Sequence, residues 1–470
     1  MPIAASVTLR PVSRAATGVT ITGRTPSMAP RKAAARQSSR AAARPRNAPT
    51  GQPEAAHESD ASATPAGSRW VDQLWGGWWA LPVPPTPARP TVMAELVEGQ
   101  VYGFDQLQGV LKILLNVRMT AVVLRGGGLL VNNPVAPTRE CLALLQTLID
   151  RHGPVRYITL SSAALEHKSY FAPFARRFPK AELWAAPGQW SFPLNIPFRA
   201  ALWPRRLAGY LADSDTPAGR AAPWGDELRV AVLGVGGSAF TGFRAPWFVD
   251  VAILHTASKT LLVTDAVCQV PLDPVPVCEL DPSPLLLRAA EEPGRGAEVP
   301  DTPANRRKGW WRVCLFATYA APTTQTPESL AYDGFRWEPG WEKTFLCFAG
   351  RLVVHPILRV LCFNRRPHEV LAWADKVASW DFKRVVPGHF DAPVSASGRQ
   401  FRAAFDFLEG ADAGGRQGGL LGRLLGRARA SPVVFPEAEL RCLRDVDAFA
   451  VARGTSEAPV VYTGGEEEGT

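Results

Sequence analysis

The chain has 470 residues, of which 46% are apolar and 20% are charged, a composition typical of a globular protein and not of a fibrous or disulfide-rich one. Its net charge of +9 comes from residues 1–53, which contain nine Lys or Arg and no acid, so the rest of the chain has as many basic as acidic residues. Because a positive field is what draws polyanions to a protein, this neutral body argues against a general nucleic-acid-binding function.

Residues 1–68 have the composition of a targeting segment. They are rich in Ala, Arg, Ser and Thr, contain no acid before Glu54, and lack the continuous apolar stretch of a secretory signal. This pattern predicts an organelle transit peptide, and composition alone fits either a plastid or a mitochondrial one. The alternative is a disordered basic tail.

The longest apolar stretch further along the chain, residues 344–363, is interrupted by Arg351, His355 and Arg359. We therefore expect no segment that spans a membrane.

Regular elements become readable after residue 118. Apolar runs at residues 119–124 and 129–132, joined by a segment with three consecutive glycines, predict a β-hairpin. A helix is expected from Thr138 to Gly153, because apolar side chains recur at helical spacing on one face. Three further elements follow: a strand at 155–160, a helix near 169–178 and a strand at 182–185.

The next segments again show both strand and helix patterns. Strands are expected at residues 229–235, 247–254 and 260–264, with a second hairpin between the last two. The C-terminal half predicts helices at 342–363, 369–380 and 398–408, and a strand at 382–386. Strands that alternate with helices but also form hairpins are typical of an α/β fold with mixed sheets and helices outside.

We expect one main domain over residues 69–409, with two parts that differ in composition. Residues 281–308 are rich in Pro, Glu, Arg and Ala, which favours an exposed insertion without a chemical role. Residues 410–470 are biased toward Gly, Arg and Leu and end in an acidic run, which is typical of a low-complexity, loosely ordered tail.

Two common kinds of site are disfavoured by their context. The seven cysteines include no C-x-x-C pair, so neither a zinc-finger lattice nor a disulfide framework is expected. Residues 234–239 match the nucleotide-binding pattern G-x-G-x-x-A, but Gly242 and Pro246 interrupt the helix that such a site requires. We expect an ordinary glycine-rich loop there.

Acids and histidines at the ends of predicted strands are the candidate metal ligands. Four residues have this placement: Glu166 and His167, Asp265, and His389. Carboxylate oxygens and imidazole nitrogens that follow strands can face one cation. Taken singly, such residues are more often capping or solvated groups.

These residues resemble the motifs of a known family. Residues 262–265 are similar to the strand that presents the bridging Asp in metallo-β-lactamase-fold hydrolases, and residues 387–389 to the segment with their last His. More closely, the chain resembles the plant and algal family catalogued as domain of unknown function 4336, a divergent branch of that fold. The resembling stretches cover most of residues 102–409 and lie at 102–109, 117–120, 134–138, 166–168, 178–181, 258–265 and 382–384.

The resemblance implies an αββα sandwich, with two β-sheets face to face and helices outside, and one surviving metal site. The superfamily motif H-x-H-x-D-H would place its first two histidines on Ser162 and Ala164, so the first metal site is lost. A neutral hydroxyl is a poor ligand and a methyl group is none. The ligands implied for the second site suffice for one divalent ion (Zn, Fe or Mn) and are Glu166, His167, Asp265 and His389.

Two functions remain open. In the first, the ion lowers the pKa of a bound water and hydroxide attacks an ester, thioester or phosphoester, with weak or altered activity because the second cation is missing. In the second, the chain is a non-catalytic descendant that binds a small molecule or a protein, and the four residues form a salt-bridged cluster with Lys168. The resemblance implies a chloroplast location, which the leader permits.

Overall fold

The computed structural model describes residues 90–110, 113–189, 207–235, 248–291, 298–319, 337, 339–409, 433–454 and 456–460. They belong to a compact unit within Ala63–Thr470. The predicted leader at 1–68 and residues 236–239 of the glycine-rich loop lie outside the described residues. Among the described helices, none has the length and apolar character needed to cross a bilayer.

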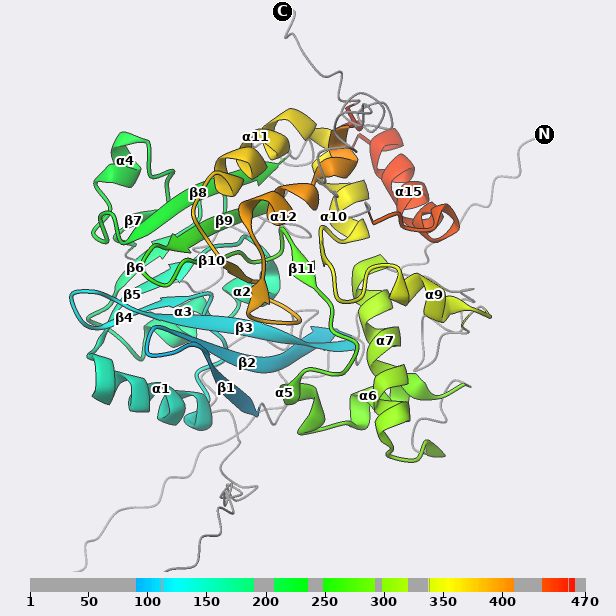
Figure 1. The fold of residues 1–470 in the computed structure, drawn as a ribbon, viewed down its shortest axis with the longest axis horizontal. Helices are drawn as coiled ribbons and strands as arrows, with labels where there is room; N and C mark the ends of the chain where they lie inside the picture. The colour runs from blue at the N-terminus through cyan, green and yellow to red at the C-terminus, as the bar shows by residue number, and fades with distance from the viewer. Residues whose placement is uncertain are drawn as a thin grey trace, which may run out of the picture. The chain divides into compact units, whose positions relative to one another are not determined.

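Seven strands form the first sheet, in the order β1-β2-β3-β4-β5-β6-β7 (Figure 1). Their bounds are Thr91–Val97, Val101–Val110, Ile113–Val123, Leu129–Asn132, Val155–Leu160, Glu182–Ala185 and Gly209–Tyr210. Strands β1 to β4 pair antiparallel, whereas β4 to β7 pair parallel. The predicted hairpin is confirmed, and its turn uses Gly127 and Gly128 at φ of 76° and 84°, a region that glycine adopts without strain.

Five strands form the second sheet, in the order β14-β13-β10-β9-β8. In that order their bounds are Val394–Ser395, Arg384–Val386, Thr260–Leu262, Phe248–His255 and Leu228–Val235. The second predicted hairpin, between β9 and β10, is confirmed. Because β10 and β13 pair in parallel, the segments that follow them leave the sheet at the same edge.

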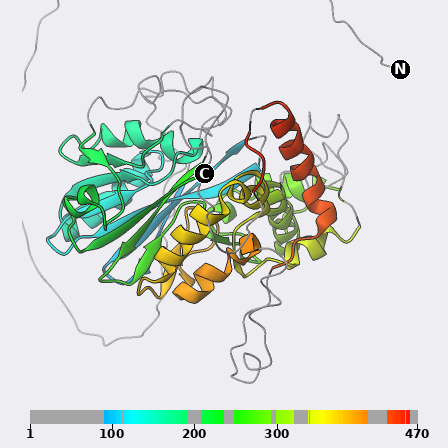
Figure 2. The same cartoon turned by 90° about the horizontal axis from the view of Figure 1, so that it is seen from above.

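The two sheets lie face to face. Val122 and Leu130 of the first sheet and Val230 and Val251 of the second belong to one buried apolar cluster between them. Figure 2 shows the teal helices of residues 139–175 on one side of the strands and the yellow and orange helices of residues 356–403 on the other. The layers are those of the αββα sandwich that the resemblance implied, so the predicted fold class is confirmed.

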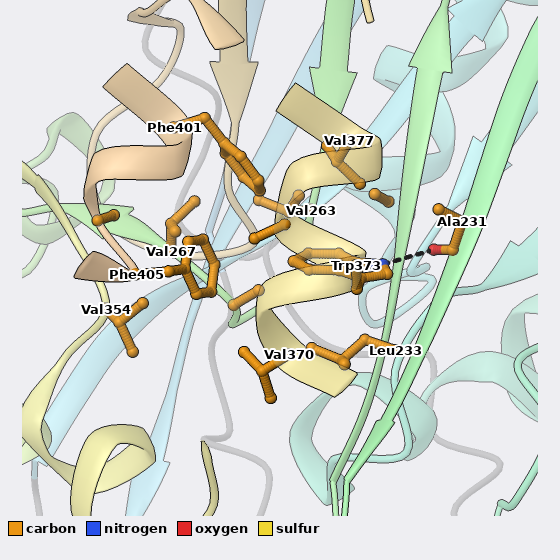
Figure 3. Packing of buried hydrophobic residues seen from close by; sticks show 14 of the residues in the cluster. Ala231, Leu233, Val263, Val267, Val354, Val370, Trp373, Val377, Phe401 and Phe405 are labelled. Atoms are coloured by element: carbon orange, nitrogen blue, oxygen red, sulfur yellow. Dashed lines mark hydrogen bonds between the residues drawn. The ribbon is translucent and has the colours of Figure 1, made fainter. Parts of the chain in front are cut away.

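Helices cover the outer faces of both sheets. On the first sheet lie α1 (Arg139–His152) and α3 (Phe171–Ala175), which the short helix α2 (Leu165–Lys168) precedes. On the second sheet lie α10 (Pro356–Leu361), α11 (Pro367–Ala378) and α12 (Gly398–Ala403). Helix α1 has the predicted ends, because the Thr138 side chain accepts from the Cys141 N–H and Gly153 follows its last residue. In α11, Trp373 packs on the second sheet and donates its indole N–H to the Ala231 carbonyl at 3.2 Å (Figure 3).

The segment expected as an exposed insertion differs from that expectation. Residues 281–308 include α6 (Ser283–Ala289) and the start of α7 (Pro303–Tyr319), next to α5 (Pro276–Glu279). Leu285 is buried in a third apolar cluster together with Trp310 of α7. The helical pattern of α6 and α7 was missed in the sequence because charged residues and prolines surround the few apolar side chains that these helices bury within residues 281–308.

The helix expected at 342–363 is two helices separated by a strand. Helix α9 (Trp341–Leu346) is followed by Gly350 at φ 71°, by β12 (Leu352–Val353) and then by α10 and the 3-10 turn η4 (Phe363–Arg365). Strand β12 pairs with β11 (Cys268–Gln269) in a small sheet of its own. The left-handed Gly350 changes the direction of the chain after α9, and Pro356 begins α10, so apolar spacing alone was misleading here.

The tail expected at 410–470 contains the helix α15 (Glu437–Ala452). Its Asp447 forms a buried ion pair with Arg365 of η4, so this part of the chain is attached to the domain. The remaining short elements are α4 (Pro217–Arg220) and η5 (Asp406–Glu409).

Candidate metal centre

The segment with Glu166 and His167 follows β5 and is fixed to the opposite sheet. Ser162 forms an isolated β-bridge with Asp250 of β9. The chain then enters α2, where His167 is fully buried and Glu166 is partly exposed. The bridge between the sheets therefore sets where the two side chains lie.

The loop that carries Asp265 is held by a buried carboxylate. Asp250 accepts the backbone N–H groups of Thr264, Asp265 and Ala266 at 3.0, 2.8 and 2.7 Å. Sequence reasoning missed Asp250, although an acid in an otherwise apolar strand is a signal, since a buried charge requires partners. These three bonds fix the backbone that presents Asp265.

Asn133 ties the same loop to the first sheet. Its amide donates to the Thr264 hydroxyl at 2.9 Å, and its carbonyl oxygen accepts the Ser161 N–H at 2.7 Å. All three residues are buried. The ends of β5 and β10, one from each sheet, are thus held at a fixed separation.

His389 follows β13 in the segment that begins Pro387-Gly388. The Gly388 N–H donates to the Thr264 carbonyl at 2.9 Å, which places the two loops side by side. A Cβ at Gly388 would lie 3.0 Å from Cε1 of His167, so a larger residue there would push the His167 ring away by a few tenths of an ångström.

The four predicted residues converge. One ligand atom from each of Glu166, His167, Asp265 and His389 lies within 4.8 Å of the others. In the described part of the chain, these four residues form the cluster of His, Cys, Asp or Glu side chains that could hold a metal ion. His389 Nε2 is 3.1 Å from Asp265 Oδ1 and 3.1 Å from His167 Nε2, and His167 Nε2 is 3.7 Å from Asp265 Oδ1. Atoms bound tetrahedrally to one ion at about 2.0–2.1 Å lie about 3.3–3.4 Å apart, so these three atoms have the spacing of a ligand set.

Glu166 is the outer member of the group. Among the described ion pairs, Asp265 contacts both imidazoles, whereas Glu166 contacts neither. Burial disfavours the charged form of His389, but the hydrogen bond to Asp265 and the charges of Asp265 and Glu166 raise its pKa. Glu166 therefore acts on His389 through its charge.

Asp265 is an ionised carboxylate. Its burial opposes ionisation, but the charge of His167 and the hydrogen bonds from both imidazoles outweigh it and hold the pKa of Asp265 well below its usual range. A charged oxygen between two imidazole nitrogens is a ligand set that suits a divalent cation.

Ser162 and Ala164, where the resemblance would place two further histidines, are not among the four converging residues. The Ser162 hydroxyl accepts the Ala164 N–H at 3.0 Å, in a local turn. His255 lies outside the group, at the other end of β9, where its Nδ1 is 2.8 Å from Ser258 Oγ. Among the residues that the structure describes, the potential ligands therefore form one group.

The comparisons with solved structures give metallo-β-lactamase-fold proteins at low overall similarity. The DIM-1 metallo-β-lactamase is 10% identical, with 68% of this chain and 98% of that chain covered and a TM-score of 0.32. The metallo-β-lactamase from Pontibacter korlensis is 13% identical (67% and 99% covered, TM-score 0.32), and the Flv1 flavodiiron core from Synechocystis sp. PCC6803 is 11% identical (68% and 61% covered, TM-score 0.35). None of the curated proteins searched is similar to the chain.

A family model described as Domain of unknown function (DUF4336) matches residues 98–407. This range contains every strand of the second sheet, all four candidate ligands and nearly all of the first sheet. The chain therefore belongs to the DUF4336 family.

Proposed function

We propose that the chain is a single-metal hydrolase that acts on an ester, thioester or phosphoester. The observation that carries the proposal is the convergence of Glu166, His167, Asp265 and His389, with ligand atoms from positions more than two hundred residues apart within 4.8 Å. Two imidazoles and two carboxylates are a sufficient set for one Zn, Fe or Mn ion.

When bound, such an ion would supply a water of lowered pKa and would polarise the bond to be cleaved. The chain's own residues would give the site a closed and an open side. His167 is fully buried, whereas the side chains of Asp265 and His389 are 14% and 15% exposed, so a substrate has access from their side. Ser162 and Ala164 leave no place for a second cation, which supports slow or altered turnover.

Metal analysis of the purified protein tests the proposal. We expect close to one equivalent of a divalent ion in the wild type and a large loss in His389→Ala. His255→Ala is the control, because it removes a buried strand-end histidine outside the group. A metal content below about a tenth of an equivalent that His389→Ala leaves unchanged would overturn the proposal, since ligand removal must weaken a real site.

A non-catalytic scaffold is the second candidate, and one observation favours it. His389 Nε2 and Asp265 Oδ1 lie 3.1 Å apart, within hydrogen-bonding distance, so the two side chains can form a stable ion pair without a metal. This candidate predicts the same melting temperature with and without chelator. A chelator-induced drop of several degrees would exclude it, because only a ligand bound by the folded state stabilises that state.

A further inference from the structure

The segment that presents His389 is held from the opposite sheet by Arg118 of β3. Arg118 donates its backbone N–H to the Gly388 carbonyl at 2.8 Å. Its guanidinium donates to the Pro387 carbonyl at 3.0 Å and to the Phe390 carbonyl at 2.8 Å. These bonds bracket His389 on both sides, and Arg118 is only 4% exposed.

Asn116, two residues earlier on β3, holds the residue after His389. Its side-chain oxygen accepts the Phe390 N–H at 2.8 Å, and its amide donates to the Phe390 carbonyl at 3.0 Å. Phe390 has a φ of 59°, a left-handed conformation that is unfavourable for a non-glycine residue. The paired bonds therefore stabilise an unfavourable backbone conformation next to His389.

The same strand determines which nitrogen of His389 carries a proton. Nδ1 of His389 lies 2.8 Å from the Asn116 backbone carbonyl, which can only accept. Nδ1 is therefore a donor in any protonation state, and Nε2 faces Asp265 and His167, where it either donates to the Asp265 carboxylate or is free to bind a metal. This is the arrangement in which a neutral imidazole binds a metal through Nε2.

The charge of Arg118 is balanced by Asp105 on β2. Asp105 Oδ2 accepts from Arg118 at 2.8 Å and from the Asn116 amide at 3.2 Å, and Asp105 and Arg118 face each other in the β2–β3 pairing. One carboxylate thus orients both side chains toward the His389 segment.

We propose that Arg118 and Asn116 are positioning residues, which hold the His389 ring with Nδ1 on the Asn116 carbonyl and direct Nε2 into the metal site. Neither side chain reaches the ligand atoms, and both act through the backbone of residues 387–390. The consequence for metal binding rests on the proposed function, whereas the state of the His389 ring does not.

The test compares Arg118→Met with Arg365→Met in the full chain. Arg365 is a matched control, because it is also 4% exposed, also bonds a backbone carbonyl and is also paired with a carboxylate, that of Asp447, away from the four ligands. Arg118→Lys is a milder variant that keeps a positive charge beside Asp105. A single ammonium group cannot reproduce the set of hydrogen bonds that the planar guanidinium donates to the Pro387 and Phe390 carbonyls. Thermal melting verifies that each variant folds.

The first measurement is ¹⁵N NMR of the histidine rings in metal-free protein at about pH 9, where an ordinary histidine is neutral. The His389 signal is assigned with His389→Ala. We expect Nδ1 to be protonated in the wild type and in Arg365→Met, whether or not Nε2 also carries a proton that bonds Asp265. Part of the population should lose the Nδ1 proton and keep only Nε2–H in Arg118→Met, with Arg118→Lys between them. An unchanged His389 spectrum in folded Arg118→Met and Arg118→Lys overturns the inference.

The second measurement is Zn²⁺ affinity by competition with a chromogenic chelator. We expect Arg118→Met to bind about 10–100-fold more weakly than the wild type, the usual loss when a residue that orients a ligand is removed, and Arg365→Met to be unchanged. If the wild type binds Zn²⁺ and Arg118→Met binds it equally well, the inference fails and the proposed function stands. If the wild type binds no Zn²⁺ but the His389 ring responds to Arg118→Met, the proposed function fails and the positioning role stands.

Discussion

Asp250 shows how a residue outside the ligand group determines the group's geometry. Burial raises its pKa to about 6, and the charge of Asp265 adds to this, whereas the three backbone N–H bonds oppose it. Burial of the Asp250 carboxylate is unfavourable, and the three backbone N–H bonds offset part of this cost. The same bonds hold the loop on which Asp265 lies. Arg118 and Asn116 have the corresponding task for His389.

The spacing of the ligand atoms predicts unequal roles for the two carboxylates. Asp265 contacts both imidazoles, at 3.1 and 3.7 Å, and Glu166 contacts neither among the described ion pairs. We expect Asp265→Asn to weaken Zn²⁺ binding more than Glu166→Gln, by about tenfold or more. Chelator competition measures both affinities, and Asp381→Asn, at a surface ion pair, is the control. Equal losses in the two site variants would contradict the ranking.

His255 predicts a pH dependence of stability that is independent of any metal. Burial lowers its pKa to about 4, and the charge of Arg125 adds to this effect, while Glu227 Oε1 lies 3.9 Å from Nε2. The unfolded chain takes up this proton near pH 6.5, but the folded protein resists until about pH 4. Stability linked to His255 is therefore present above pH 6.5 and is lost as the pH falls toward 4, by about 3 kcal/mol in all.

Urea unfolding of the wild type and of His255→Gln between pH 7 and pH 4 tests this. The unfolding free energy should fall more steeply with acidification in the wild type, because the variant lacks the buried imidazole. His355, whose pKa is also lowered to about 4 by burial, contributes to both proteins and cancels in the difference. Parallel pH curves would show that His255 does not resist protonation.

At the scale of elements, prediction succeeded where local signals agreed with tertiary packing. Helix α1 was predicted because its apolar spacing, the Thr138 cap and Gly153 agree. The strands β1 and β2 were not predicted as strands, although nearly all of β2 was within the resembling range. Their sequences alternate poorly, because β2 buries polar side chains such as Gln106 among apolar ones, a pattern that only the packed structure explains.

Helix α11 packs on the second sheet through several apolar side chains, and Trp373 is the largest of them. The side chain is 5% exposed, and its N–H bonds the Ala231 carbonyl of the edge strand β8. We expect Trp373→Ala to reduce the unfolding free energy by about 3–5 kcal/mol, because a large cavity forms. Trp373→Phe should cost less, about 1–2 kcal/mol, mainly the lost hydrogen bond and indole area.

Urea denaturation measures these changes, with Phe449→Ala on α15 as the control. Phe449 is 63% exposed, so its removal should change stability by less than about 0.5 kcal/mol. A Trp373→Ala variant as stable as the control would mean that α11 is not held by this side chain.

At the scale of the whole molecule, the sequence supplied the ligands but not the structure that holds them. Glu166, His167, Asp265 and His389 were found because acids and histidines at strand ends, read with the family resemblance, form a recognisable pattern. Asp250, Asn116 and Arg118 carry no such pattern. Arg118 contacts residues about 270 positions away, and only the pairing of two sheets brings them together.

The leader gives a prediction for the intact protein in the cell. Residues 1–68 carry nine basic residues and no acid before Glu54, the composition of a transit peptide. We propose that this segment directs the protein to plastids, and expect a fusion of residues 1–68 to a fluorescent protein to enter them and to be shortened. A fusion with the nine Lys and Arg replaced by Gln is the control, since import needs the positive charge. Fluorescence in mitochondria would support the other organelle, and fluorescence that stays in the cytosol at full length would identify the leader as a basic tail without a targeting role.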